Sequence, residues 1–329
     1  MPEHSELIGA LLHPPQPLTF TGAVELYTPN APGVLAVKTD VTPYALYLTT
    51  GVTAGAVALI GAGGVPAPGG DYDAATEAWI AASSGTYSTP EIEALDDLVL
   101  YCKGVTIAAG GSLWDASSLL AITAVDNATD AQLNLKTALS TLTYVGSPTF
   151  TARQGIQLNG SNQMIGSGQV PSAISAAPEG FVGAYLRQNK SGADDFTYIA
   201  YGQDADSRVV DLSIQGGLVS SIHGGGNRFL TQGGNEQGCN SGSLTTTDRI
   251  AAFNQTSAIT ARSTPTAACE TQVYYGAANI DGASGSDWNS NQYAALWQGW
   301  GQGLTEAELL GLHAAIETCL DVFGAGVIS

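Results

Sequence analysis

The sequence predicts a mainly β protein: an antiparallel β-sandwich (jelly roll) with a short helical lead-in, a C-terminal helix and a small N-terminal β domain. From Tyr144 onward the apolar residues fall in strand-length runs separated by Gly, Asn, Asp and Ser, as in a sandwich. The 329 residues include 41 Gly and only 12% charged residues, which fits many short strands joined by glycine turns. Helical periodicity is confined to the segment before Tyr144 and to the C-terminus.

Changes in this pattern divide the chain into three segments. Residues 1–70 alternate short β-prone runs with Pro and Gly turns, which predicts a small antiparallel unit ending in a Gly/Pro-rich linker. Residues 71–143 form the helical lead-in. Residues 144–329 form the sandwich and its C-terminal helix.

The lead-in carries local helix signals. In "STPEIEALDDLVLYCKG", Thr89 suits the N-cap, Pro90 the first helical position and Gly104 the C-terminus. An apolar stripe at spacings of three and four supports this helix. Further helices are expected from Asp73, around Trp114, and from Asp130 to about Leu139.

Eight strands are expected in the sandwich. Each is a β-prone run bounded by turn residues. In chain order they are "GIQLNG", "GFVGAYLR", "FTYIAYG", "RVVDLSIQ", "GLVSSI", "RIAAFNQ", "TQVYYGA" and "QYAALWQGW".

The C-terminal helix has the clearest local signal. Thr305 and Glu308 form a capping box, and Gly324 is placed to end the helix. Its expected buried stripe comprises Leu309, Leu312, Ile316 and Cys319.

The charge of the chain restricts its partners. The formal net charge is −19, with only ten Lys and Arg, so a phosphate backbone or an anionic membrane surface would be repelled. Neither nucleic acid nor a membrane is expected as a partner. The uncharged stretch from Val41 to Gly70 is rich in Gly, Ala and Pro, which favours a buried strand and linker over a membrane span. The first residues lack the pattern of a secretory signal.

The four cysteines lie far apart and contain no C-x-x-C pair, so a zinc ribbon is not expected. Cys102 and Cys319 fall on apolar helix stripes and are expected to be buried thiols. Whether Cys239 and Cys269 bridge two loops stays open.

Five segments, taken in order, resemble a known family. They are "LDDLVLYCKG", "SLWDASSLLAI", "DAQLNLKT", "SPTFTARQGIQLNGSNQMIGSG" and "ALWQGWGQGLTEAELLGLHAAIETCLDVFG". This order, across about residues 72–325, resembles the concanavalin A-like (laminin-G-like) jelly-roll modules of bacteriophage virion proteins, which occur in tail, fibre, spike and head-appendage proteins. The resemblance implies a sandwich fold and a virus particle as the setting, and an N-terminal unit that attaches the module to the particle. It implies no chemistry.

The sequence offers no catalytic motif, so the chain is not expected to be an enzyme. β-Glucan hydrolases with related sandwiches carry an E-x-D-x-x-E carboxylate triplet, which is missing here. The nearest approach, "EIEALDD" from Glu91 to Asp97, is expected on a solvated helix face. "HGGGN" at 223–227 has no G-x-S-x-G partner and is expected to be a glycine-rich turn. A glycan hydrolase or lyase is kept as the least favoured alternative.

Polar and aromatic side chains in three loops suggest a carbohydrate site. Sugars bind aromatic faces and planar polar groups. The expected glycan-binding residues are Asp287, Trp288, Asn289, Asn291 and Tyr293, with His223 and Asn227 from a second loop. Oxygen-rich loops also suit Ca²⁺, the one cofactor considered, with Asp194, Asp195, Asp204 and Asp206 as candidate ligands.

These observations favour a phage or phage-like particle structural protein: a fibre, spike or decoration subunit whose jelly roll binds host surface carbohydrate. It would be made in the bacterial cytoplasm and exposed on the virion. A purely architectural capsid or tail protein without glycan binding is the alternative. Other virion proteins are expected as partners, and a homotrimer is expected by analogy.

Overall fold

The computed structural model describes residues 72–328, except for short segments, and four strands of the preceding part of the chain. The segments left out are 189–196, 205–208, 216–217, 224–228, 233–236, 262–266 and 285–287. The chain forms two compact units, Met1–Asp71 and Tyr72–Ser329. The helical lead-in and the sandwich therefore share the second unit.

The first unit contains one four-stranded sheet in the order β1-β2-β3-β4. Its strands are β1 (Leu18–Phe20), β2 (Leu35–Lys38), β3 (Ala45–Thr49) and β4 (Val57–Ala62). β2, β3 and β4 pair antiparallel as expected, but β1 runs parallel to β2. Residues 21–34 separate these two strands, a connection long enough for the crossover that a parallel pair requires.

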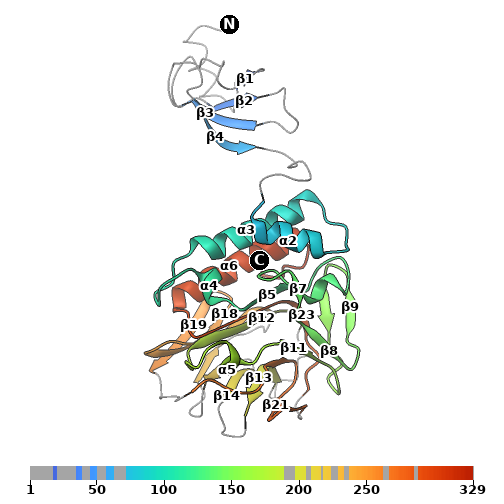
Figure 1. The fold of residues 1–329 in the computed structure, drawn as a ribbon, viewed down its shortest axis with the longest axis vertical. Coiled ribbons are helices and arrows are strands. Elements are labelled where there is room, and N and C mark those ends of the chain that lie inside the picture. The colour runs from blue at the N-terminus through green and yellow to red at the C-terminus, as the bar shows by residue number, and fades with distance from the viewer. Residues whose placement is uncertain are drawn as a thin grey trace. The chain divides into compact units, whose positions relative to one another are not determined.

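The second unit is a sandwich of two sheets, so the predicted mainly β fold is confirmed (Figure 1). The first sheet has the order β19-β18-β17-β12-β23-β10-β9, with β5 also paired to β23. Its strands are β5 (Leu119–Ile122), β9 (Thr149–Thr151), β10 (Gly155–Gln157), β12 (Gly180–Gln188), β17 (Gly238–Leu244), β18 (Asp248–Phe253), β19 (Thr256–Ala261) and β23 (Gln292–Trp300).

The second sheet has the order β16-β15-β14-β13-β20-β11-β8, with β21 paired to β13 and β22 paired to β21. Its strands are β8 (Thr143–Val145), β11 (Met164–Gly166), β13 (Thr197–Gln203), β14 (Val209–Gln215), β15 (Leu218–His223), β16 (Phe229–Gln232), β20 (Tyr274–Tyr275), β21 (Asn279–Ile280) and β22 (Ala283–Ser284). The eight strand runs expected from the sequence all contain strands of these two sheets.

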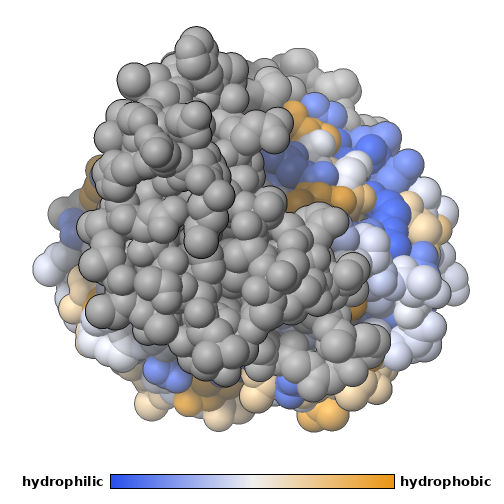
Figure 2. All heavy atoms as spheres, turned by 90° about the horizontal axis from the view of Figure 1, so that it is seen from above, coloured by the Kyte–Doolittle hydropathy of each residue, from blue (hydrophilic) through white to orange (hydrophobic). Residues whose placement is uncertain are grey.

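Helices cover the outer face of the first sheet (Figure 1). α6 (Glu306–Val322) packs on β17, β18 and β19, and α3 (Thr89–Gly104) packs on α6. The C-terminal helix is thus confirmed, together with its capping box and its buried stripe. The remaining helices are α2 (Ala74–Ala82), α4 (Leu113–Ala116) and α5 (Pro171–Ile174). Where Figure 2 is coloured, hydrophilic side chains surround smaller apolar patches.

The helix expected from Asp130 to about Leu139 was wrong. Only Asp130–Gln132 forms a turn of 3₁₀ helix, and β6 (Leu133–Asn134) then pairs with β7 (Leu139–Ser140). The Asn134 side chain accepts from the Leu120 amide at 3.0 Å and donates to the Ser118 carbonyl at 3.0 Å. These bonds tie the segment to the start of β5, so tertiary contacts override its local helix propensity.

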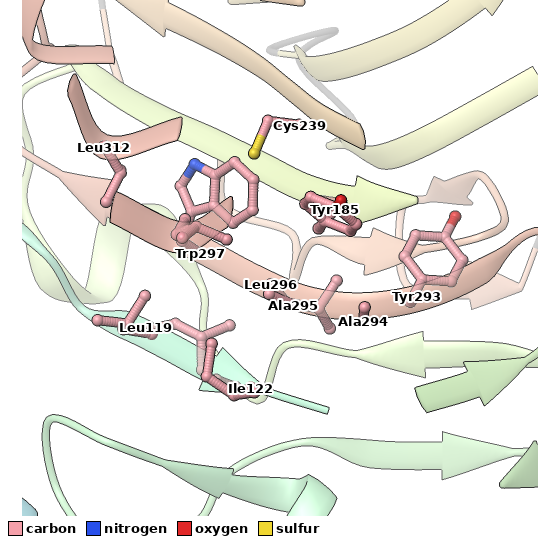
Figure 3. Packing of buried hydrophobic residues seen from close by; sticks show 14 of the residues in the cluster. Leu119, Ile122, Tyr185, Cys239, Tyr293, Ala294, Ala295, Leu296, Trp297 and Leu312 are labelled. Carbon is pink, nitrogen blue, oxygen red and sulfur yellow. The ribbon is translucent and has the colours of Figure 1, made fainter. Parts of the chain in front are cut away.

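A bulge in β23 directs neighbouring parts of this strand to opposite faces of the sheet. Tyr185 of β12 pairs with Ala295 and Leu186 pairs with Tyr293, so Ala294 is an extra residue. Tyr293 therefore faces the second sheet, where its hydroxyl donates to the Ile199 carbonyl at 3.2 Å. Trp297 faces the helices and lies beside Leu312 and Cys239 (Figure 3).

The Trp297 indole fits because its neighbour on β12 is Gly183. A Cβ at Gly183 would lie 2.2 Å from indole atoms. Any larger residue there would displace the side chain that joins the sheet to α6.

His313 of α6 anchors a buried polar network against the sheet. Its Nδ1 lies 2.9 Å from the Asn254 carbonyl and its Nε2 lies 2.6 Å from Ser241 Oγ. A carbonyl only accepts, so we assign the proton to Nδ1, and Ser241 donates to Nε2. Trp297 Nε1 in turn donates to Ser241 Oγ at 3.2 Å. A neutral imidazole therefore satisfies every member of this network.

The turn between β9 and β10 lies in "PTFTARQG" and ties the sheet to the helices. Arg153 sits there with a φ of 60°, and its Nη1 lies 2.7 Å from Glu91 Oε1 of α3. Its guanidinium also lies over the rings of Tyr87 and Phe323, 5.2 and 5.6 Å from their centroids. This segment, one of those that resemble the virion modules, therefore joins the sheet to the helices.

The solvated face expected for Glu91 to Asp97 was wrong in part. Glu91 and Asp96 are each only 8% exposed. Glu91 meets Arg153, and Asp96 Oδ1 accepts from the Asp73 amide at 2.8 Å. Of the acidic residues in the group, only Asp97 is exposed.

All four cysteines are buried and none is in a disulfide, so Cys239 and Cys269 do not form a bridge. Cys239 Sγ lies 3.6 Å from the His313 carbonyl, and Cys269 Sγ lies 3.7 Å from the Thr271 carbonyl. The helices of the described residues are too short or too polar to cross a membrane.

The His313 network predicts a pH-dependent stability. Burial lowers the pKa of His313 to about 4, from 6.5. As the pH falls, the unfolded chain therefore binds a proton at this residue before the folded chain does. The contribution of His313 to the stability of the folded state is complete above pH 6.5 and is lost as the pH falls toward 4. We expect this site alone to reduce the free energy of unfolding by about 3 kcal/mol across that range. Urea unfolding at several pH values measures it.

The matched control is His313→Gln, which cannot titrate. Its stability should change less than that of the wild type between pH 6.5 and 4. Equal pH slopes in the two proteins would contradict a neutral buried His313.

Candidate functional site

Three of the expected glycan-binding residues lie inside the protein. Asn289 is 4% exposed, and Asn291 and Tyr293 are fully buried. Asn289 Nδ2 donates to the Tyr293 hydroxyl at 2.8 Å, and its Oδ1 accepts from the Asn291 amide at 3.1 Å. These bonds lie inside the protein, so the three buried side chains belong to the core and are not accessible to a ligand from solution.

Trp288 is the one residue of this expected set whose side chain is described and partly exposed. Asp287 and Asn227 lie outside the described residues. His223 ends β15, but its side chain is outside the described part. The structure therefore does not bring the seven expected residues together as one site.

Of the four candidate calcium ligands, only Asp204 is described, and it is 5% exposed. Its Oδ2 accepts from the Glu270 amide at 2.8 Å. Asp194, Asp195 and Asp206 lie outside the described residues. Among the residues that the structure does describe, no group of three or more His, Cys, Asp or Glu is arranged to hold a metal ion.

A groove of about 740 Å³ lies at one end of the first sheet, where the β17–β18 turn meets the start of α6. Threonines are its commonest polar residues, so we call it the threonine groove. It is lined by Ala108, Ala109, Glu179, Thr245, Thr246, Thr247, Asp248, Ile250, Ile259, Gly301, Gln302, Gly303, Thr305, Glu306 and Ala307.

The turn from Thr245 to Asp248 holds its shape through its own side chains. Thr245 Oγ1 accepts from the amides of Thr247 at 3.2 Å and Asp248 at 2.9 Å. The Thr247 hydroxyl donates to Asp248 Oδ2 at 2.6 Å. These bonds fix the backbone and leave Thr246 at the tip, where it is exposed.

Two polar groups of the groove are available to a ligand. Neither the Thr246 hydroxyl nor the Gln302 amide makes a side-chain hydrogen bond to another residue in the part of the chain that the structure describes. In the same lining, Ile259 of β19 is 48% exposed, and its cross-strand partner Ile250 of β18 is buried. The groove thus combines hydrogen-bonding groups with an apolar surface.

Three carboxylates, from Glu179, Asp248 and Glu306, also line the groove. Ser257 Oγ donates to Glu306 Oε1, which ties the start of α6 to β19. Nearby, Glu308 accepts from the amides of Thr305 at 2.7 Å and Ala108 at 2.5 Å. The last bond joins the loop before α4 to the start of α6 and closes one wall of the groove.

Two segments of the sequence contribute to this site, and neither was predicted from the sequence to be part of a binding site. "LTTTDR" places three consecutive threonines and an aspartate between two strands, and "GWGQGLTE" places Gln302 between two glycines before α6. Each is an ordinary turn by itself. Only the fold shows that they face the same groove.

The chain is similar to solved sialidase structures at low identity. No protein family model and no curated protein matches it. The Trypanosoma rangeli sialidase in complex with sialic acid matches with 10% identity and a TM-score of 0.50, over 88% of this chain and 45% of that chain. The same enzyme with 2,3-difluorosialic acid matches with 8% identity and a TM-score of 0.49, over 87% and 44%.

A carbohydrate-binding module is also similar. The Ruminococcus gnavus IT-sialidase module CBM40, bound to α2,3-sialyllactose, matches with 10% identity and a TM-score of 0.34, over 43% of this chain and 86% of that chain. This chain spans less than half the length of the sialidases it matches. At these identities the similarity shows the fold alone.

The prediction that this chain is not an enzyme was wrong, because the fold does not exclude an enzyme. The solved chain that matches with a TM-score of 0.50 is a sialidase, which is a glycosidase. The missing E-x-D-x-x-E triplet excluded one type of glycosidase, whereas this fold also occurs in a glycosidase of another type.

The buried position of Tyr293 predicts the effect of a single substitution. Tyr293→Phe removes the acceptor of Asn289 Nδ2 and one of two donors to the Ile199 carbonyl, which keeps the Gly276 amide, so we expect it to reduce the free energy of unfolding by about 1–3 kcal/mol. Chemical denaturation measures this loss.

Tyr274→Phe is the matched control, because Tyr274 is only partly buried and makes no side-chain hydrogen bond among the described residues. It should alter stability by less than about 0.5 kcal/mol. A Tyr293→Phe protein of unchanged stability would show that this hydroxyl has no structural role.

Proposed function

We propose that the second unit binds a glycan in the threonine groove. The observation that carries this proposal is the composition of the groove: hydroxyls, an amide and carboxylates surround an exposed aliphatic surface. Sugars present the complementary pattern, because hydroxyls project around the ring while its C–H groups form apolar patches.

The rigidity of the groove supports the same function. The β17–β18 turn is fixed by its own hydrogen bonds, and the start of α6 is fixed by its capping box and by Ser257. A binding site whose walls are already ordered loses little conformational entropy when it binds. Such an ordered site suits a ligand whose hydroxyl groups each contribute only a modest binding free energy.

Removing the two available polar groups should weaken binding. We expect Thr246→Ala combined with Gln302→Ala to lower the affinity for the strongest ligand on a glycan array by roughly tenfold, because each lost hydrogen bond contributes about 0.5–1.5 kcal/mol. Thr318→Ala, on an exposed part of α6 outside this groove, is the matched control and should bind like the wild type. Equal binding by all three proteins would place the site elsewhere.

Glycan processing is the second candidate, favoured by the carboxylates of Glu179, Asp248 and Glu306 in the same groove. Glycosidases commonly use a pair of carboxyl groups, one as acid and one as base or nucleophile. The ligand found on the array can be incubated with the full chain and assayed for new reducing ends. Cleavage that Asp248→Asn or Glu306→Gln abolishes would establish this activity, and intact glycan would leave binding alone.

We further propose that the chain belongs to a phage or phage-like particle, as a fibre, spike or decoration subunit. The segments from Leu95 to Gly104, from Ser147 to Gly168 and from Ala295 to Gly324 support this, because their order resembles virion jelly-roll modules. A host surface polysaccharide would then be the glycan, and the first unit would attach the chain to other virion proteins. A homotrimer is the corresponding assembly. The alternative is an architectural subunit that binds no sugar.

Deletion of residues 1–70 tests the attachment role. The full chain should be incorporated into purified particles, whereas the shortened chain should remain unattached, because the deletion removes the four-stranded unit. Immunoblotting of the particles measures incorporation, and a thermal melt checks that the shortened chain is folded. Incorporation of a folded, shortened chain would contradict the attachment role.

A further inference from the structure

We infer that the threonine groove selects neutral or positively charged sugars and rejects anionic ones. This inference rests on the proposed glycan binding and adds the chemical class of the ligand. The carbohydrates named for the similar solved sialidases, sialic acid among them, carry a carboxylate. The groove of this chain has the opposite preference.

The charges on the walls all have one sign. Glu179, Asp248 and Glu306 contribute carboxylates, and no Lys, Arg or His is among the residues that line the groove in the described part of the chain. The neighbouring Arg249 is 2% exposed and is not part of the lining. A carboxylate on a bound sugar would therefore meet three like charges without a guanidinium to pair with.

The start of α6 does not offset this charge. A helix N-terminus carries a partial positive charge of about half a unit, which often attracts anions. Here Glu308 already accepts from the Thr305 amide, and Glu306 lies in the same turn. Two full negative charges within the first turn exceed the partial charge of the helix, so an anion gains nothing there.

The hydrogen bonds of Asp248 and Glu306 orient these two carboxylates without neutralising them. Asp248 Oδ2 accepts from the Thr247 hydroxyl, and Glu306 Oε1 accepts from Ser257. Both donors are neutral, so the charges remain. The net charge of −19 adds a field of the same sign over the whole chain. A hydroxyl or ammonium group on a sugar is the donor that such acceptors favour.

The test compares three forms of one glycan: the neutral parent, its anionic oxidised product and the neutral methyl ester of that product. The strongest neutral ligand on a glycan array is oxidised at its primary hydroxyls to carboxylates, and part of the product is then converted to methyl esters. The full chain should bind the oxidised form at least roughly tenfold more weakly than the ester, because only the charge differs between them. The difference should shrink in about 0.5 M NaCl, where exposed charges are screened.

Neutralising the wall should relax this selectivity. Asp248→Asn should narrow the difference in affinity between the oxidised glycan and its ester relative to the wild type, because it removes one of the repelling charges. Asp97→Asn, an exposed carboxylate of α3 outside the groove, is the matched control and should leave this difference unchanged.

The results distinguish the charge preference of the groove from the glycan binding on which that preference rests. Equal binding of the oxidised glycan and its ester, or an array dominated by anionic glycans, would overturn the charge preference while leaving glycan binding in place. An array without any binding would overturn the glycan-binding proposal itself, and the charge preference with it.

Discussion

The pairing of β23 with β12, interrupted by one extra residue at Ala294, is the constraint on which the rest of the second unit depends. Alternation along a strand would otherwise place Tyr293 and Trp297 on the same face. The bulge instead sends Tyr293 toward the second sheet and Trp297 toward α6, so one strand contacts both layers. The segment that directly follows β23 supplies Gly301 and Gln302 to the threonine groove. The position of the groove therefore follows from the register of this strand pair.

Local signals in the sequence predicted those elements whose cause is local. The capping box at Thr305 and the stripe of α6 act within one helix, so both could be found without knowledge of the fold. β17 could not: "GCNSGSL" has little β propensity, and it forms a strand because β12 and β18 bury it on both sides. The burial of Asn289 and Asn291, which were expected to contact a sugar, could not be predicted for a related reason. Composition shows that Asn289 and Asn291 are polar, but not that Tyr293 supplies a buried partner. The groove is assembled from segments far apart in the chain, so no window of sequence contains it.

The segments that carry the family resemblance have structural roles in this chain. In "PTFTARQG", Arg153 meets α3 through Glu91 and the end of α6 through Phe323. In "NGSN", Asn159 Oδ1 accepts from the Ser161 amide at 3.0 Å. This bond stabilises the turn in which the chain passes from one sheet to the other. Such motifs join the sheets and helices of a sandwich to one another. They therefore indicate a fold and a setting more strongly than they indicate a ligand.

The β17–β18 turn lies between the paired strands of the sheet and the residues that we propose to contact a ligand. Leu244 and Arg249 are paired across the hairpin, and the Thr245 amide donates to the Asp248 carbonyl at 2.9 Å. Below this point the strands are held on both sides by the sheet, whereas the tip at Thr246 is held only by its own turn. The length and composition of the tip can therefore change without altering strand register. A protein built in this way can acquire a new specificity by replacing a few residues, and it offers a site where recognition loops can be exchanged on a constant core.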